Sequence, residues 1–228
     1  FSFRLYFFFF VIFSISVYIG ISVSNSASVN FGISVSNSVS VNIGINVTSI
    51  ASFNIGISVS NSGNVKIGIS VSNSVSANIG ISVSNSVSVN VGISVIHSAI
   101  GNIGFCVIIS ARVIIGISVN NSASGNVGIS VNKSASVNIE ISFNSSTSVN
   151  DGIKVSDNAS IKIDFVVINI TGVNIKISVN NSYCVNIGIS ASNSAISNSG
   201  IRVSNSASFS FVISVSNIDS VILVSVSN

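Results

Sequence analysis

A twelve-residue repeat occupies most of this chain and limits the folds that the chain can adopt. The segment Asn78–Val89, with the sequence NIGISVSNSVSV, serves as the reference copy, and its positions are numbered as columns one to twelve. Seventeen copies follow one another from Tyr18 to Val221 without an insertion or a deletion. Because a short fixed period is typical of repeat architectures, each copy is expected to be one structural unit that packs on its neighbours.

Apolar residues occupy alternate columns of the repeat. Column four is Ile or Phe and column six is apolar in every copy, while columns two, ten and twelve are mostly apolar. This spacing of two is the period of a β-strand that buries one face, and Ile and Val favour strands. We therefore predict that columns ten, twelve, two, four and six point into a core.

Two groups of columns predict changes of chain direction. Columns seven to nine, Ser84-Asn85-Ser86 in the reference copy, break the alternation. Because Asn tolerates the left-handed conformation and bonds to its own backbone, this triplet predicts a turn. The Asn-x-Gly of columns one to three, Asn78 to Gly80, predicts a second and softer corner.

The composition excludes several classes of protein. Only 6% of the residues are charged and the chain has no Pro, whereas globular chains carry about 25% charged residues. Classical disorder requires low hydrophobicity and high charge, which this chain lacks. Its few cations are scattered and do not alternate with aromatic residues, so nucleic-acid binding is not predicted.

These observations predict an all-β fold, for which three arrangements are open. We favour a β-solenoid with two repeats per coil, because a coil of one repeat is too narrow for five apolar side chains. Two strand layers would then face each other about 10 Å apart, with Ser-Asn-Ser at both edges. A cross-β fibre of many chains is second, since it suits low charge and the absence of Pro. An antiparallel up-and-down barrel is third, because its aromatic girdles and unequal loops are missing.

Residues 1–23 differ from the repeats that follow. Arg4 precedes the apolar run Leu5–Phe13, a pattern that resembles a secretory signal peptide. An uncleaved anchor is the alternative, because Leu5–Val23 approaches the ~20 apolar residues that cross a bilayer. The predicted organisation is a signal peptide or anchor over 1–23 and a single solenoid domain over 24–228. The predicted localisation is extracellular or at the cell surface.

Two segments predict contacts with other molecules. Ile96, Ile100, Ile108 and Ile109 place apolar residues on the polar face, which indicates either decay of the repeat or an exposed patch for a partner. The final run Ile222–Asn228 carries no polar cap. An uncapped strand edge predicts self-association by pairing with another chain.

Most of the charge lies between Lys133 and Lys176. Asp157, Asn158 and Asp164 are candidate calcium ligands, but the EF-hand spacing is missing, so a solvated face is the favoured interpretation. Asp151 occupies a normally apolar column and is expected to mark a distorted or frayed rung of the sheet.

The sequence predicts no catalytic, metal or cofactor site, and the chain is not expected to be an enzyme. His97 is the only His, so it alone could serve as the base for a nucleophilic Ser. Cys106 and Cys184 are expected to lie about 15 to 31 Å apart in stacked strands. Because a disulfide requires Cα atoms within about 7 Å, both thiols are predicted to be free.

Several Asn-x-Ser/Thr triplets would accept glycans if a eukaryotic cell secreted the chain. Their asparagines are Asn46, Asn120, Asn132, Asn144, Asn158, Asn169 and Asn180.

Three functional hypotheses follow. The leading one is a non-enzymatic secreted or surface repeat protein with a structural or adhesive role, which presents flat columns of Ser, Asn and Gly to a surface or glycan. In its twelve-residue period and outward hydroxyls the chain resembles the short-repeat insect antifreeze solenoids, and this resemblance implies binding to ice or another crystal surface. Those solenoids use Thr-x-Thr rows and disulfide-braced coils, where this chain has rows of Ser and two cysteines.

The third hypothesis is a translated 36-nucleotide tandem repeat with no selected function. Ile, Val, Ser, Asn, Gly, Ala, Thr and Asp, the residues reached by purine-N-T codons, make up most of the repeats. The retention of apolar residues in columns four and six favours selection for a core.

Overall fold

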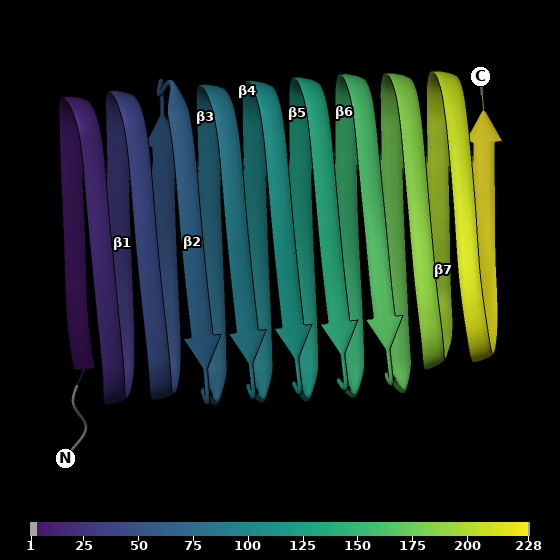
Figure 1. Ribbon diagram of the computed structural model, residues 1–228, viewed down its shortest axis with the longest axis horizontal. Coiled ribbons are helices and arrows are strands. Elements are labelled where there is room, and N and C mark those ends of the chain that lie inside the picture. The colour runs from purple at the N-terminus through teal and green to yellow at the C-terminus, as the bar shows by residue number, and fades with distance from the viewer. Residues whose placement is uncertain (1–3, 228) are drawn as a thin grey trace.

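The chain winds as a flattened solenoid whose coils stack along one axis (Figure 1). The computed structural model describes residues 4–227, and the side chains of residues 6–195 and 199–217. The strands are β1 (Arg4–Ser60), β2 (Asn64–Ser72), β3 (Ser76–Ile96), β4 (Ile100–Asn120), β5 (Ser124–Asn144), β6 (Ser148–Ile168) and β7 (Gly172–Ser227). β1 and β7 each continue around several coils. Among residues 4–227, no helix is long and apolar enough to span a membrane.

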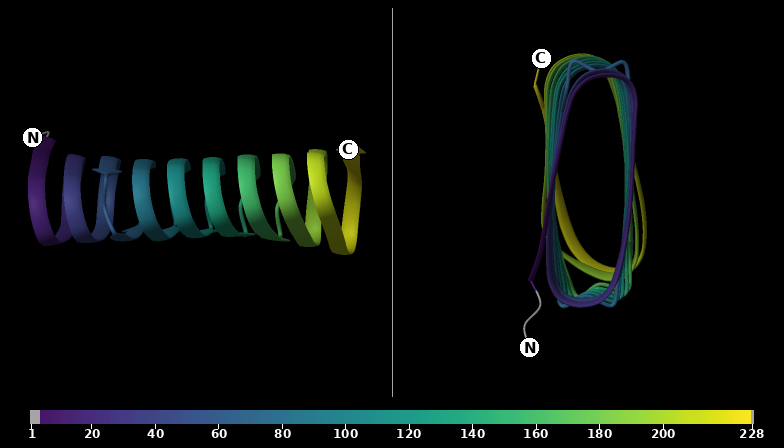
Figure 2. Two further views of the ribbon diagram at one scale, coloured as in Figure 1. Left: turned by 90° about the horizontal axis from the view of Figure 1, so that it is seen from above. Right: turned by 90° about the vertical axis from the view of Figure 1, so that its left-hand side faces the viewer.

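Each coil contains two repeats, as predicted. Every pairing between strands is parallel and joins residues 24 positions apart, so that Gly80 of β3 lies beside Gly56 of β1 and Gly104 of β4. Viewed along the axis, the coils superimpose as two long sides joined by two narrow ends (Figure 2). Successive copies of the repeat therefore lie on opposite sides of the solenoid. The predicted β-solenoid is confirmed, and the parallel pairing replaces the antiparallel alternative.

Column eight makes the turn at both narrow ends, as the sequence predicted. All eighteen non-glycine residues with positive φ fall in this column, from Phe13 to Asn217, and their φ angles lie between 47° and 59°. Asn occupies eleven of these positions, as at Asn85, and Asn is among the residues that enter the left-handed region most readily. The turn is also bonded from coil to coil, since the Asn61 backbone nitrogen donates to the Ser84 carbonyl at 3.0 Å.

The left-handed residue changes which columns point inward, and one sequence prediction is wrong for this reason. Column ten was expected in the core, yet Val39, Val75 and Val87 point outward. Column nine lies inside instead, where Ser86 is buried and its hydroxyl donates to the Ser84 carbonyl at 3.4 Å. Positive φ at column eight reverses the alternation, and the successive outward columns ten and eleven restore it. The inward set is therefore nine, twelve, two, four and six.

The predicted softer corner at columns one to three does not exist. Asn78, Ile79 and Gly80 lie within β3 and pair in register with the coils on both sides. The Asn and Gly of these columns are therefore surface residues of a strand and do not form a turn.

The two strand layers enclose one continuous apolar core. It contains mainly the Ile and Val of columns two, four, six and twelve from both layers. Fully burying one such side chain contributes about 1.5–3 kcal/mol. A large side chain in this core can fill the space left by a small neighbour. Phe143 is fully buried, and its ring lies 3.1 Å from the position that a Cβ on Gly125 would occupy.

Residues 4–23 belong to the same solenoid as the repeats that follow. β1 begins at Arg4, and the Phe7 and Phe31 rings stack with their centroids 5.1 Å apart. Phe8, Phe10 and Ile12 point outward and are exposed. Whether this segment is removed as a signal peptide stays a prediction.

Candidate functional site

The solenoid presents two broad outward faces with different side chains. The asparagine face consists of the outward residues in columns one, three, five and seven of segments 30–36, 54–60 and so on every 24 residues to 198–204. The second face consists of the same columns in segments 18–24, 42–48 and so on every 24 residues to 186–192. Because each face collects alternate copies of the repeat, the two faces can differ in chemistry although the repeats resemble each other.

A continuous asparagine ladder runs along the first of these faces. Column one is Asn in every segment of the asparagine face. From Asn54 to Asn174, each side-chain nitrogen donates to the side-chain oxygen of the Asn one coil earlier. The six bonds measure 2.7–3.0 Å and join Asn30, Asn54, Asn78, Asn102, Asn126, Asn150 and Asn174. On the second face, column one includes Lys66, Ile114 and Lys162 and forms no such ladder among the described residues.

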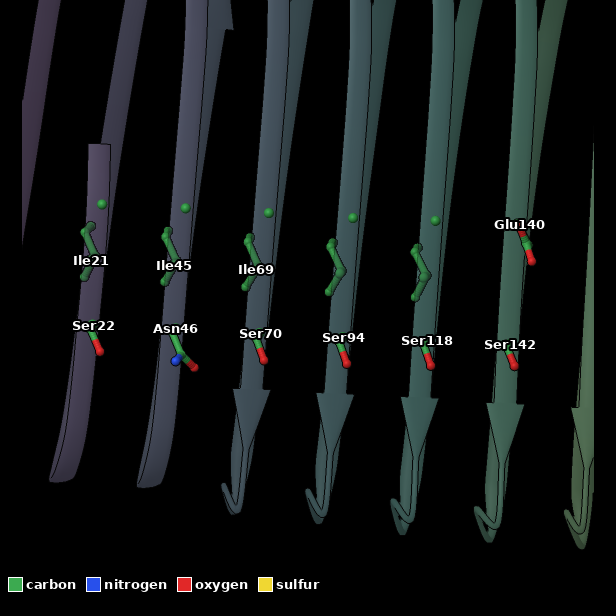
Figure 3. A pocket seen from close by; sticks show the side chains of 17 residues that line it. Ile21, Ser22, Ile45, Asn46, Ile69, Ser70, Ser94, Ser118, Glu140 and Ser142 are labelled. Carbon is green, nitrogen blue, oxygen red and sulfur yellow. The ribbon is translucent and has the colours of Figure 1, made fainter. Parts of the chain in front are cut away.

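A row of glycines beside the ladder forms a shallow groove parallel to the axis. On the asparagine face the groove follows column three from Gly32 to Gly152, between the ladder and the column-five residues, which are Ser except for Cys106 among those lining the groove. The second face has an equivalent groove from Gly20 to Gly116, and Figure 3 shows Ser70 among the column-five residues along its edge.

The fold does not require glycine at most positions of these rows. None of the column-three glycines has positive φ. A Cβ added to Gly56, Gly128 or Gly152 would meet nothing within 4 Å. Since Gly weakens a strand interior relative to other residues, packing gives no reason for its recurrence here. The consequence of the glycines is an open groove along which the backbone is accessible.

The two grooves end at side chains of opposite charge. Lys176 replaces Gly in column three of the asparagine face, and Glu140 replaces it on the second face (Figure 3). Asp164 lies one coil after Glu140 in the same column. It forms an ion pair with Lys162, whose Nζ lies 2.8 Å from Asp164 Oδ2. The hydrogen bond from Lys162 to Asp164, together with the charge of Asp164, raises the pKa of the Lys162 ammonium.

The predicted calcium candidates are not brought together. Asp157 lies at a turn and accepts a bond from Asn181, whereas Asp164 lies on the second face. Asn158 is buried in column nine, where its oxygen accepts from the Ser134 backbone nitrogen at 2.7 Å. Across residues 6–195 and 199–217, no three His, Cys, Asp or Glu side chains cluster at metal-binding distance.

Other residues singled out in the sequence lie apart from one another. Cys106 lies on the asparagine face and Cys184 at a corner, and both are free thiols, as predicted. His97 occupies a turn with its Nε2 3.2 Å from the side-chain nitrogen of Asn121. Of the candidate glycan acceptors, Asn158 is ruled out in the folded chain by its burial.

The four outward isoleucines do not form one patch. Ile96 and Ile100 flank the turn at His97, whereas Ile108 and Ile109 belong to the next turn along the chain, at the opposite narrow end. This division favours decay of the repeat over a single apolar interface. The side chains of the other predicted contact, 222–228, lie outside the described residues.

Asp151 lies in an intact rung, which corrects the expectation of fraying. It pairs in register with Val127 and Ile175 inside the core. Neither carboxyl oxygen has a hydrogen-bond partner of ordinary geometry among the described residues. Burial raises the pKa of this carboxyl well above its usual 3.8, and the neighbouring Val127 backbone opposes the shift only in part.

The asparagine ladder and the difference between the faces were missed at the level of sequence. Comparing the chain with itself at 24 residues, and not at 12, would have shown column one to be invariant in alternate copies. Comparisons of the chain with protein-family models, curated proteins and solved structures found no match.

Proposed function

We propose that this chain is a non-enzymatic structural or adhesive repeat protein that attaches to an extended, periodic partner through its asparagine face. The observation that carries the proposal is the ladder of side-chain hydrogen bonds from Asn30 to Asn174. Each bond fixes the orientation of a polar group at the surface, which is half-buried at most positions, and the row repeats at the coil spacing of about 4.8 Å. Because the side chains are already ordered, little conformational entropy is lost when they contact a regular surface.

The groove supports the same proposal. A side chain in column three would fold equally well at most positions, so the glycines leave room for a partner close to the backbone. The Ser hydroxyls at Ser58, Ser82 and Ser130 line the other edge. An attachment spread over many equivalent coils should weaken gradually as coils are lost.

The 24-residue coil permits a matched deletion test. Removing residues 78–101 deletes one coil and leaves every remaining segment on its own face. Removing residues 78–89 deletes half a coil and transfers all later segments to the opposite face, which divides the asparagine ladder. Binding to cellulose and to cross-linked polygalacturonate particles would be measured as the bound fraction, with circular dichroism as the folding control.

The proposal predicts a modest loss of binding for the one-coil deletion and a much larger loss for the half-coil deletion. Equal binding by the two folded deletion variants would contradict it. Complete loss after changing one outward Ser, such as Ser82→Ala, would also contradict it, because a distributed surface has no single essential residue.

Ice or crystal-surface binding is a second candidate, supported by one observation. Ser70, Ser94, Ser118 and Ser142 form an unbroken hydroxyl row on the second face (Figure 3). The coil has 24 residues, twice the length on which the resemblance to the antifreeze solenoids rested. Thermal hysteresis of a protein solution tests this candidate directly, and its absence would remove the candidate.

A translated repeat without selected function remains the alternative to both. Undirected divergence would change column one equally in all copies, yet this column is Asn throughout the described asparagine face and varied on the second face. An excess of silent over replacement differences between the copies in the coding DNA would support selection. Equal rates would support the alternative.

A further inference from the structure

The cations of the asparagine face gather at the closed end of its groove. Lys154 lies in column five, Lys176 in column three one coil later, and Arg202 in column five of the next coil. All three side chains are exposed. From the strand and coil spacings, Lys154 and Lys176 have Cα atoms about 8 Å apart, and Lys154 and Arg202 about 10 Å apart.

No carboxylate lies outward on this face among the described residues. Glu140 and Asp164 belong to the second face, where they accompany Lys66 and Lys162. Asp157 lies at the adjoining turn, with Lys133 one coil earlier, and accepts a bond from Asn181. No ion pair within the described residues involves Lys154, Lys176 or Arg202. Their summed charge of +3 equals the net charge of the whole chain.

The groove that leads to these cations can bond to a polyhydroxylated chain. Within the ladder, each Asn uses one N–H and one lone pair of its side chain, so a second N–H and a second lone pair remain for a ligand. Ser130 and Ser178 place hydroxyls beside Lys154 in the adjacent coils. Between Asn126 and Ser204, no aromatic or aliphatic side chain is described among the outward residues of this face.

We propose that the end of the asparagine-face groove, at Lys154, Lys176 and Arg202, binds a linear acidic polysaccharide. The proposal rests on the adhesive function of this face and adds the chemical class of its partner. Sugar hydroxyls would bond to the Asn and Ser rows, and the carboxylates or sulfates of the polymer would pair with the three cations. A sugar chain suits this end of the groove better than a nucleic acid, because the described outward residues of this face between Asn126 and Ser204 include no aromatic side chain for base stacking, and Phe8 and Phe10 line only the far end. It also suits this end better than a lipid bilayer, because the same outward residues include no large apolar side chain for insertion.

The test measures binding of the full chain to soluble polygalacturonate and to the same polymer with its carboxyls fully methyl-esterified. The test variant combines Lys154→Ser, Lys176→Gly and Arg202→Ser, each of which restores the residue usual for its column. The control variant combines Lys66→Asn, Lys133→Asn and Lys162→Asn, which removes the same charge from the second face and a turn. Circular dichroism and urea unfolding confirm that all three proteins fold alike.

We expect the wild type to bind polygalacturonate at least tenfold more tightly than the esterified polymer at low salt. The test variant should lose at least tenfold in affinity, the control variant less than twofold, and added salt should weaken wild-type binding by screening. Gly128→Val, which places a side chain in the groove without changing charge, should also weaken binding.

Three outcomes would overturn the proposal. The first is an equal loss of affinity in the test and control variants. The second is equally tight and cation-dependent binding of single-stranded DNA or of vesicles with anionic lipids. The third is equal affinity for the acidic and esterified polymers, which would leave the adhesive function in place while excluding recognition of acidic groups. Loss of adhesion in the half-coil deletion distinguishes these results from a failure of the proposed function itself.

Discussion

The side-chain nitrogen of Asn102 donates to the side-chain oxygen of Asn78 at 2.8 Å, across one coil of 24 residues. Asn78 in turn donates to Asn54 at 2.7 Å. The ladder therefore has a direction as well as a period, and each member in its interior makes two side-chain bonds. Asn78 and Asn90 occupy the same column in successive copies of the repeat. They have different roles, because Asn90 lies on the second face outside the ladder.

Asn78→Ala should destabilise the solenoid more than Asn90→Ala. The first substitution removes two ladder bonds, each with a net contribution of about 0.5–1.5 kcal/mol, and the second removes none. We expect a loss of about 1–3 kcal/mol for Asn78→Ala and under about 0.5 kcal/mol for Asn90→Ala, measured by urea unfolding. Equal effects would show that the ladder does not stabilise the fold.

Ile109→Asn should stabilise the protein. Ile109 has φ of 58°, where a β-branched residue is strained, and Asn is the residue usual for its column. Relief of this strain is worth about 1–2 kcal/mol. The neighbouring Ile108→Asn is the control, because it makes the same chemical change at an exposed position outside the positive-φ set. A greater gain from Ile108→Asn would contradict the explanation.

Asp151→Val should stabilise the protein at every pH and most strongly at neutral pH. Removing an unpartnered buried carboxyl recovers about 1–3 kcal/mol even when the carboxyl is protonated. Because burial raises the folded-state pKa of Asp151, the folded state holds the proton more tightly than the unfolded state. The net destabilisation by Asp151 is therefore smallest below pH 3.8, and it grows as the pH rises from 3.8 through the raised pKa.

The check is urea unfolding of the wild type and of Asp151→Val between pH 4 and pH 8. The difference in stability between the two proteins should grow with pH. Asp157→Asn, which changes an exposed carboxyl at a turn, is the control and should not remove the pH dependence. A constant difference between wild type and Asp151→Val would show that the buried carboxyl titrates normally.

The central part of the fold could be predicted from the sequence because strand periodicity is a local property. Ile81 and Val83 point inward whichever way the chain turns after them. Asn85 indicates a left-handed residue, because Asn adopts the left-handed backbone conformation more readily than most residues. The orientation of Ser86 and Val87 could not be predicted, since one positive φ reverses the alternation after it. Burial of the small hydroxyl of Ser86 is tolerated because it bonds to the Ser84 carbonyl.

The candidate site was harder to predict than the core. Its residues, Asn, Gly and Ser, are the commonest outward residues of every copy, and they become a surface only after coil length assigns alternate copies to different faces. Lys154, Lys176 and Arg202 are 22 to 48 residues apart and come together through stacking alone.

The most direct test of the 24-residue coil is the distance between outward column-five residues. Nitroxide labels would be placed on Ser58→Cys with Ser82→Cys, and separately on Ser58→Cys with Ser70→Cys, after Cys106 and Cys184 are changed to Ser. Ser58 and Ser82 are register partners in adjacent coils, whereas Ser70 lies on the opposite face. Strong dipolar broadening of the electron paramagnetic resonance spectrum is predicted for the 58/82 pair and none for the 58/70 pair. Broadening that is stronger for the 58/70 pair would show a twelve-residue coil and would contradict the two-face arrangement.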